Sequence, residues 1–73
     1  MTKQITWVGE PPTRCDVTNQ LITNEFIDGR LKHTGVWGCF HPNTYDRLGC
    51  GLGMGKGQRY KLQDDGRWLK VEG

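Results

Sequence analysis

Apolar residues along this chain occur in short alternating runs and nowhere keep the spacing of an amphipathic helix. Glycine, proline, threonine and asparagine interrupt every run, which favours short strands joined by turns. The pattern predicts strands at residues 3–8, 21–27, 36–40, 59–62 and 68–71. We therefore expect a small all-β fold built of antiparallel β hairpins.

Turn-forming residues separate the predicted strands. Asp28-Gly29 and Asp64-Asp65-Gly66 are tight-turn sequences, so each predicts a hairpin between the runs that flank it. Residues 31–34 are then either the second strand of the first hairpin or a loop. His41-Pro42-Asn43 predicts a further turn, and residues 45–48 suffice for one turn of helix.

The expected core is thin. The chain has 73 residues, of which 34% are hydrophobic, and we interpret residues 1–73 as one small β domain. Domains of this size often need a metal, disulfides or a partner. The residues expected to build the core are Ile5, Trp7, Ile22, Phe26, Val36, Phe40, Leu52, Tyr60, Trp68 and Val71.

Every second residue from Gly49 to Gly57 is glycine. On an extended strand, side chains alternate between faces, so one face of this segment would be bare. A bare face lets a backbone, an aromatic ring or a ligand approach closely, and one tryptophan could cover it. We expect an ordered contact surface, with a flexible glycine loop as the alternative. The glycine spacing matches neither the P-loop nor the dinucleotide-binding fingerprint.

Charge and cysteine content narrow the class of protein. The formal net charge of +2 argues against a strongly basic nucleic-acid binder, although Lys56, Arg59 and Lys61 form a basic run. This run is either a solvated strand face or a contact for an acidic surface or phosphates. The N-terminus lacks the apolar region of a signal peptide, and no apolar run is long enough to span a bilayer. Three cysteines, an odd number, favour a reducing cytosol over a disulfide framework.

Cysteine and histidine spacing predicts no metal. Structural zinc takes four ligands, usually as two pairs with C-x-x-C spacing, and the chain has no such pair. Threonine stands three residues after both Cys15 and His41. We therefore expect no zinc and no other cofactor. The fallback ligands are Cys15, His41, Cys39 and Cys50.

Five segments in order resemble the motif pattern of a family of small proteins encoded by tailed bacteriophages. That pattern runs C-D-x-C, F-x-D-G, G-x-W-x-x-M-C-x-x-C, G-x-G-L-G-x-G-x-G-Q-x-Y and D-G-R-[FW]-x-K-V. The matching segments are residues 15–18, 26–29, 35–44, 49–60 and 65–71. The resemblance implies a zinc-ribbon-like fold whose four ligand positions fall on Cys15, Thr18, His41 and Thr44. Since two of these are threonine, it implies a degenerate ribbon that has lost its metal.

The resemblance also implies a phage origin. We expect a non-enzymatic phage structural protein, made in the bacterial host cytoplasm and located in the virion. It would be an accessory or decoration (cement) protein that binds the major capsid protein or another virion protein, with no role for a membrane. The alternatives are a nucleic-acid-binding zinc-ribbon-like module and a host-directed phage inhibitor. The residues expected to bind are Trp37, Gly51, Gly53, Gly55, Lys56, Gln58, Arg59 and Tyr60.

Overall fold

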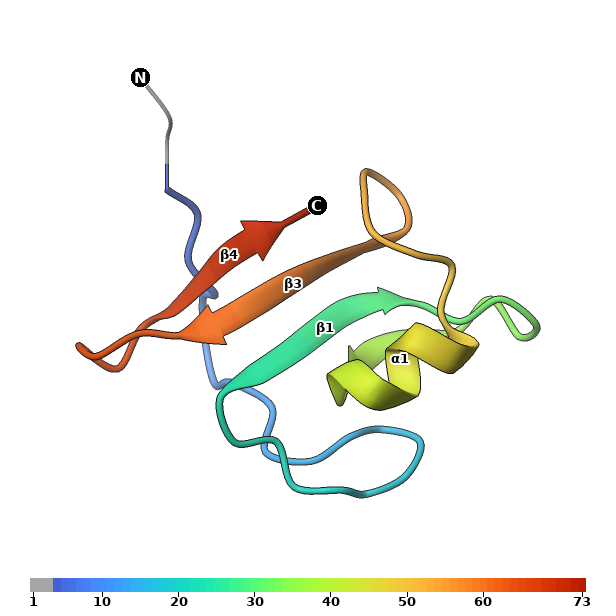
Figure 1. The fold of residues 1–73 in the computed structure, drawn as a ribbon, viewed down its shortest axis with the longest axis horizontal. Helices are drawn as coiled ribbons and strands as arrows, with labels where there is room; N and C mark the ends of the chain where they lie inside the picture. The colour runs from blue at the N-terminus through green and yellow to red at the C-terminus, as the bar shows by residue number, and fades with distance from the viewer. Residues whose placement is uncertain (1–3) are drawn as a thin grey trace.

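Strand β1 (Glu25–Arg30) is central to the fold, because strands pair with both of its edges. In the computed structural model, which describes residues 4–73, β2 (Trp37–Phe40) lies along one edge and β3 (Gly57–Leu62) along the other. Strand β4 (Trp68–Glu72) completes an antiparallel sheet of order β2-β1-β3-β4 (Figure 1). The small all-β fold expected from the sequence is confirmed.

Asp28 and Gly29 do not form the tight turn that the sequence predicts. Both lie inside β1, where they pair with residues of both neighbouring strands. Gly29 serves packing instead, since a Cβ there would lie 2.5 Å from Tyr45 Oη. The chain turns further on, so residues 31–34 form part of the loop that joins β1 to β2.

The hairpin between β3 and β4 is confirmed. Gln63 N–H donates to Arg67 O at 2.8 Å, and Gly66 N–H donates to Gln63 O at 3.0 Å. Gly66 adopts a φ of +87°, in the left-handed region. Glycine reaches this conformation without the steric cost that a Cβ would add, so Asp64-Asp65-Gly66 is a true turn sequence.

The N-terminal segment pairs with the outer edge of β4 (Figure 1). Trp7 N–H donates to Trp68 O at 2.9 Å, and Lys70 N–H donates to Ile5 O at 2.8 Å. The strand predicted at residues 3–8 is thus reduced to a bridge, and residue 3 lies outside the described residues. This pairing covers part of an otherwise open sheet edge.

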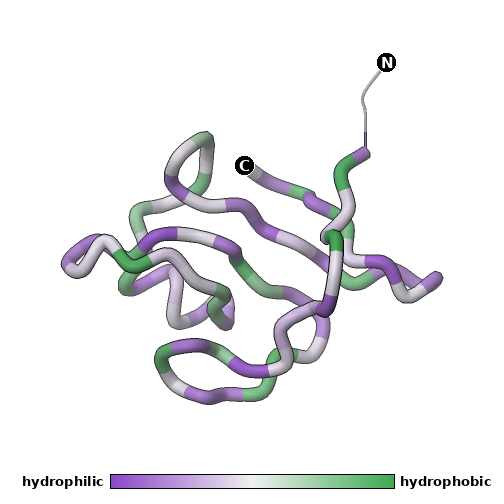
Figure 2. The backbone as a smooth tube through the Cα atoms, turned by 180° about the vertical axis from the view of Figure 1, so that it is seen from behind, coloured by the Kyte–Doolittle hydropathy of each residue, from purple (hydrophilic) through white to green (hydrophobic). Residues whose placement is uncertain are grey.

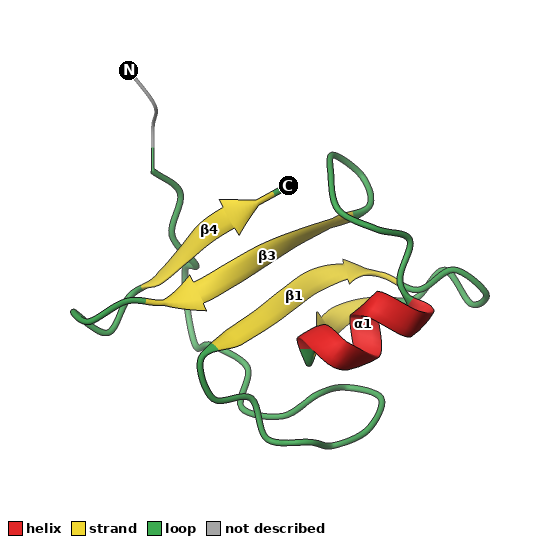
Figure 3. Cartoon of the chain, in the orientation of Figure 1, coloured by secondary structure: helices red, strands yellow, loops and turns green. Residues whose placement is uncertain are grey.

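Helix α1 (Pro42–Leu48) is longer than the single turn that the sequence predicts. His41 is its N-cap, and His41 Nδ1 accepts a hydrogen bond from Asn43 N–H at 3.2 Å. Proline suits the first helical position because its missing N–H would have no partner there. The predicted turn at His41-Pro42-Asn43 is therefore the start of this helix, which lies over one face of the sheet near β1 and β2 (Figure 3).

Both faces of β1 are buried, and this divides the core into two layers. Phe26 and Ile27 are adjacent, point to opposite faces and are both 0% exposed. On the helix side the buried residues are Cys15, Ile27, Phe40 and Tyr45. On the other side they are Ile22, Phe26 and Tyr60, with Trp7, Cys39 and Trp68 packed against them.

The expected core is correct in its centre and wrong at its margins. Ile22, Phe26, Phe40 and Tyr60 are buried, and Trp7, Leu52 and Trp68 are partly buried against the two layers. Ile5, Val36 and Val71 are exposed instead; Ile5 and Val36 lie outside the four strands, and Val71 is near the end of the edge strand β4. The residues that the sequence reasoning missed are Cys15, Ile27 and Tyr45.

The Tyr45 side chain joins helix, sheet and glycine segment. Added Cβ atoms at Gly29, Gly49 and Gly57 would all collide with this ring. The Tyr45 hydroxyl lies 2.8 Å from Gly51 O and 2.7 Å from Lys56 O, so its single proton is within hydrogen-bond reach of both carbonyls. Burial is the largest cause that raises the pKa of Tyr45, so the hydroxyl stays a donor.

Tyr45→Phe should lower the free energy of unfolding by roughly 1–2 kcal/mol, because two carbonyls lose a buried hydrogen-bond donor. Urea denaturation measures the change. Tyr60→Phe is the matched control, since that ring lies in the other core layer, and it should cost less. Equal costs for the two variants would contradict the role assigned to the Tyr45 hydroxyl.

Candidate contact surface

The glycine segment is a loop, and the expected extended strand with a bare face is wrong. Gly51, Gly53 and Gly55 have φ values of +97°, +135° and +73°. An added Cβ at any of these three would meet no described atom within 4 Å, so no ring or backbone covers them. The chain has to reverse between α1 and β3, and these left-handed glycines allow it.

Close approach does occur in this segment, but at Gly49 and Gly57. The ring that lies against them is Tyr45 of α1, whereas the sequence suggested a tryptophan. The alternation of glycines therefore has two separate causes: the outer ones make room for a ring, and the inner ones permit positive φ. Sequence alone presents both as one pattern.

Arg59 and Tyr60 were expected to contact a partner, but both side chains make their contacts inside the fold. Tyr60 is 6% exposed and stacks on Phe26 with ring centroids 5.2 Å apart. The Arg59 guanidinium faces the helix side among three carboxylates, those of Glu25 at 3.6 Å, Asp46 at 4.0 Å and Glu72 at 3.1 Å. Its Nε is close to Glu72 but not aligned for a hydrogen bond, so we treat this contact as an ion pair.

Trp37, Lys56 and Gln58 lie with Asp28 and Arg30 at one end of the sheet, and we call these five residues the Trp37 patch. Arg30 pairs with Trp37, and Asp28 pairs with Gln58, so these four side chains share one face. Lys56 lies across from Arg30, whose N–H donates to Lys56 O at 2.9 Å.

Trp37 has a fixed orientation although its side chain is accessible. The residue is 47% exposed, and its Nε1–H donates to Asp28 Oδ1 at 2.6 Å. A hydrogen bond to a carboxylate is stronger than one between neutral groups. It ties the indole of β2 across to β1, so the ring is held in place before any partner binds.

The N-terminal segment covers only one half of this face of the sheet and leaves the half with the Trp37 patch open. Trp7 packs edge-on against Phe26 and Tyr60, with centroid distances of 5.2 and 5.3 Å. Seen from behind, this segment crosses the sheet where β1 begins and β3 ends (Figure 2). The opposite end, where β1 ends and β3 begins, carries the patch.

The Cys15 thiol, in the turn at residues 15–18, is surrounded by hydrogen-bond donors. Burial raises the pKa of Cys15, but hydrogen bonds from the Thr18 hydroxyl and the N–H groups of Thr18, His41 and Val17 outweigh it, so the pKa falls from 9.0 to about 7. The bond from His41 N–H brings this turn against the start of α1. Thr44, one turn into the helix, is 1% exposed.

The fallback metal ligands do not converge. Within residues 4–73 no three His, Cys, Asp or Glu side chains are placed to hold an ion together. Cys39 lies in the sheet, where burial and then the charges of Asp28 and Asp16 raise its pKa to about 12. Cys50 lines a separate hollow of about 550 Å³ beside α1. The absence of zinc stays a prediction.

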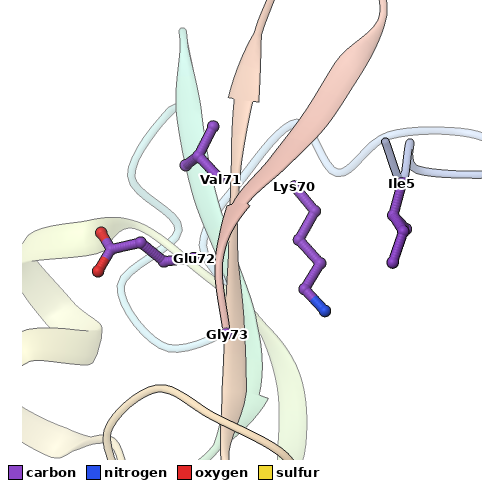
Figure 4. A pocket seen from close by; sticks show the side chains of 5 residues that line it. All are labelled: Ile5, Lys70, Val71, Glu72 and Gly73. Atoms are coloured by element: carbon purple, nitrogen blue, oxygen red, sulfur yellow. The ribbon is translucent and has the colours of Figure 1, made fainter. Parts of the chain in front are cut away.

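A second hollow of about 280 Å³ runs along the outer edge of β4. Figure 4 places Ile5 and Lys70 on one side of the strand and Glu72 on the other, so its lining residues do not point to a common centre. No helix among the described residues is long and apolar enough to cross a membrane.

Comparisons with protein-family models, with curated proteins and with solved structures find no match. The bacteriophage resemblance therefore remains an expectation that rests on the sequence motifs.

Gly55→Ala should cost roughly 1–2 kcal/mol of folding free energy, the usual penalty for an L-residue in the left-handed region. D-alanine at the same position, introduced by chemical synthesis, favours positive φ and should cost nothing. Thermal unfolding of the two proteins compares them. A similar loss with D-alanine would mean that a methyl group clashes there, contrary to the open space around Gly55.

Folding stability should rise between pH 7 and pH 9, because folded Cys15 loses its proton near pH 7 and the unfolded thiol keeps it until about pH 9. The gain is complete above the unfolded pKa, reaches at most about 3 kcal/mol, and is lost as the pH falls through the folded pKa. Urea denaturation across this range, compared with Cys15→Ser, measures it.

Cys50→Ser is the control for this pH series and should keep the slope of the wild type. A slope that persists unchanged in Cys15→Ser would assign the effect to another group.

Proposed function

We propose that the protein is a non-enzymatic accessory protein that docks onto a larger protein assembly through the Trp37 patch. The assembly is a phage particle, and the surface that it contacts is the capsid. The observation that carries the proposal is the half-exposed Trp37, held by Asp28. Tryptophan and arginine are the residues most enriched at the energetic centres of interfaces, and the patch has both.

A held tryptophan favours binding for a second reason. Ordering a side chain at an interface costs about 0.5–1.5 kcal/mol, and a ring that is already fixed avoids most of that cost. The hydrogen bond to Asp28 also leaves the indole without a free donor. A partner therefore gains from contact with the ring itself, which suits burial in a shallow apolar depression.

The small hydrophobic core favours a protein that works while bound to a partner. A partner that binds only the folded form stabilises it by mass action, by about 2.7 kcal/mol at a concentration one hundred times Kd. A capsid lattice repeats the same surface many times and so offers a high local concentration of sites. The assignment to a phage follows from the motif resemblance, and the patch supports a protein contact of some kind independently of it.

Nucleic acid is the second candidate, because Arg30 lies beside Trp37, with Lys56 on the other side of Arg30, and these cations could hold phosphates while a base stacks on the indole. Asp28 lies two residues before Arg30 on the same face of β1 and lowers the net charge of the patch to +1, which is small for a phosphate-binding surface. Two phosphate contacts release only about 1.4–1.8 counterions, a small contribution to affinity. These observations favour a protein partner, which a host-directed inhibitor would also bind.

Trp37→Ala should weaken binding to purified particles at least about tenfold, which corresponds to roughly 1.4 kcal/mol. Quantitative mass spectrometry of particles from the phage that encodes the chain first establishes how many copies they carry. Particles that lack the protein are then incubated with each purified variant. Val8→Ala, a truncation of an exposed apolar residue elsewhere, should bind as the wild type does.

Absence of the protein from particles would reject the phage assignment. Unchanged binding of a folded Trp37→Ala protein would reject the patch as the contact.

A further inference from the structure

We propose that the partner meets the Trp37 patch with a short extended acidic segment, in which an apolar side chain is followed by carboxylates. This inference rests on the proposed function, since it names the chemistry of the protein partner. The patch combines an apolar ring with two cations, and each part selects one feature of such a segment.

The cations of the patch have no carboxylate of their own. The ion pairs within the described part of the chain involve Arg59 and Arg67, and none includes Arg30 or Lys56. The carboxylates of Glu25, Asp46 and Glu72 surround Arg59 on the helix side of the sheet, away from the patch.

Asp28 accepts the Trp37 indole N–H at 2.6 Å and forms no ion pair with Arg30 or Lys56 among the described residues, so the two cations and one carboxylate leave the patch a net charge of +1. Exposed cations next to a desolvated contact attract carboxylates and disfavour other partners, so they set specificity and association rate. The folded chain thus offers unpaired positive charge beside its most accessible aromatic ring. An acidic segment supplies the charge that the patch lacks.

The spacing of the patch fixes the length of that segment. Trp37 is on β2 and Arg30 on β1, and Lys56 is in the turn that leads into β3, where its carbonyl accepts from Arg30 N–H; neighbouring segments of this kind are about 4.8 Å apart. The row therefore spans about 10 Å, the reach of roughly three extended residues. An apolar residue on Trp37 would place the carboxylate two positions later, on the same side, between Arg30 and Lys56. Gln58 next to this row can donate or accept one further hydrogen bond.

The experiment titrates the whole chain, labelled with ¹⁵N, at low salt. The probe is the synthetic peptide acetyl-Val-Thr-Glu-Thr-Glu-amide, and the control peptide carries glutamine in place of each glutamate. Trp37→Phe identifies the indole signal of Trp37. The acidic peptide should shift that signal and the amide signals of Arg30, Lys56 and Gln58, and the glutamine peptide should bind at least about tenfold more weakly.

A charge reversal tests the electrostatic part. Arg30→Glu should abolish the shifts caused by the acidic peptide. Arg14→Glu makes the same change at an exposed arginine outside the patch and should leave them intact. A twelve-nucleotide strand of deoxythymidine is the competing probe and should leave the patch signals unmoved.

Shifts with the oligonucleotide and not with the peptide would replace the acidic segment with nucleic acid. No shift with either probe, or equal binding of the glutamine peptide, would overturn the inference. Failure of this inference can be distinguished from failure of the proposed function. Protein found on particles without peptide binding would reject the acidic segment alone, and peptide binding by a protein absent from particles would reject the phage assignment alone.

Discussion

The rest of the structure depends on one packing constraint, the seating of the Tyr45 ring against backbone that carries no side chains. Gly29 of β1, Gly49 at the end of α1 and Gly57 at the start of β3 leave room for the ring. Its hydroxyl then reaches two carbonyls of the loop between the last two. A single side chain thereby sets the distance of helix from sheet and the path of the glycine loop.

A second constraint is that β1 has to be covered on both faces by a short chain. The helix covers one face, and the N-terminal segment covers half of the other, with Trp7 against Phe26 and Tyr60. The other half of that face carries the Trp37 patch, which none of the described residues covers in the way that Trp7 covers Phe26 and Tyr60.

The sequence predicted β2, β3 and β4 to within two residues and the hairpin at Asp64-Asp65-Gly66, whereas the strand predicted at residues 21–27 runs from Glu25 to Arg30. It failed at Asp28-Gly29, because a turn dipeptide is ambiguous when a distant ring requires the glycine for packing. It failed similarly at the glycine segment, where residues 49–57 combine two requirements that are set by tertiary structure. Periodicity records which side chains alternate and carries no information about what lies opposite them.

The candidate site was predicted in part. Trp37, Lys56 and Gln58 lie in the patch, but Arg59 and Tyr60 are taken up by the helix side and the core. Arg30 and Asp28 were missed as contact residues because Asp28-Gly29 was interpreted as a turn. Placing both inside a strand would have brought them opposite Trp37 and Gln58, so a single error of local structure hid two of the five residues of the surface.

The strand order also has a consequence for how this chain reaches its native state. A short loop connects β1 to β2, its neighbour on one edge. The neighbour on the other edge, β3, comes later in the chain, after the helix and the glycine loop. Closing that longer loop costs chain entropy before any contact repays it. Phe26 is shielded by Tyr60 and Trp68, both from the last quarter of the sequence. This face of the central strand therefore cannot be buried before β3 and β4 have been synthesised.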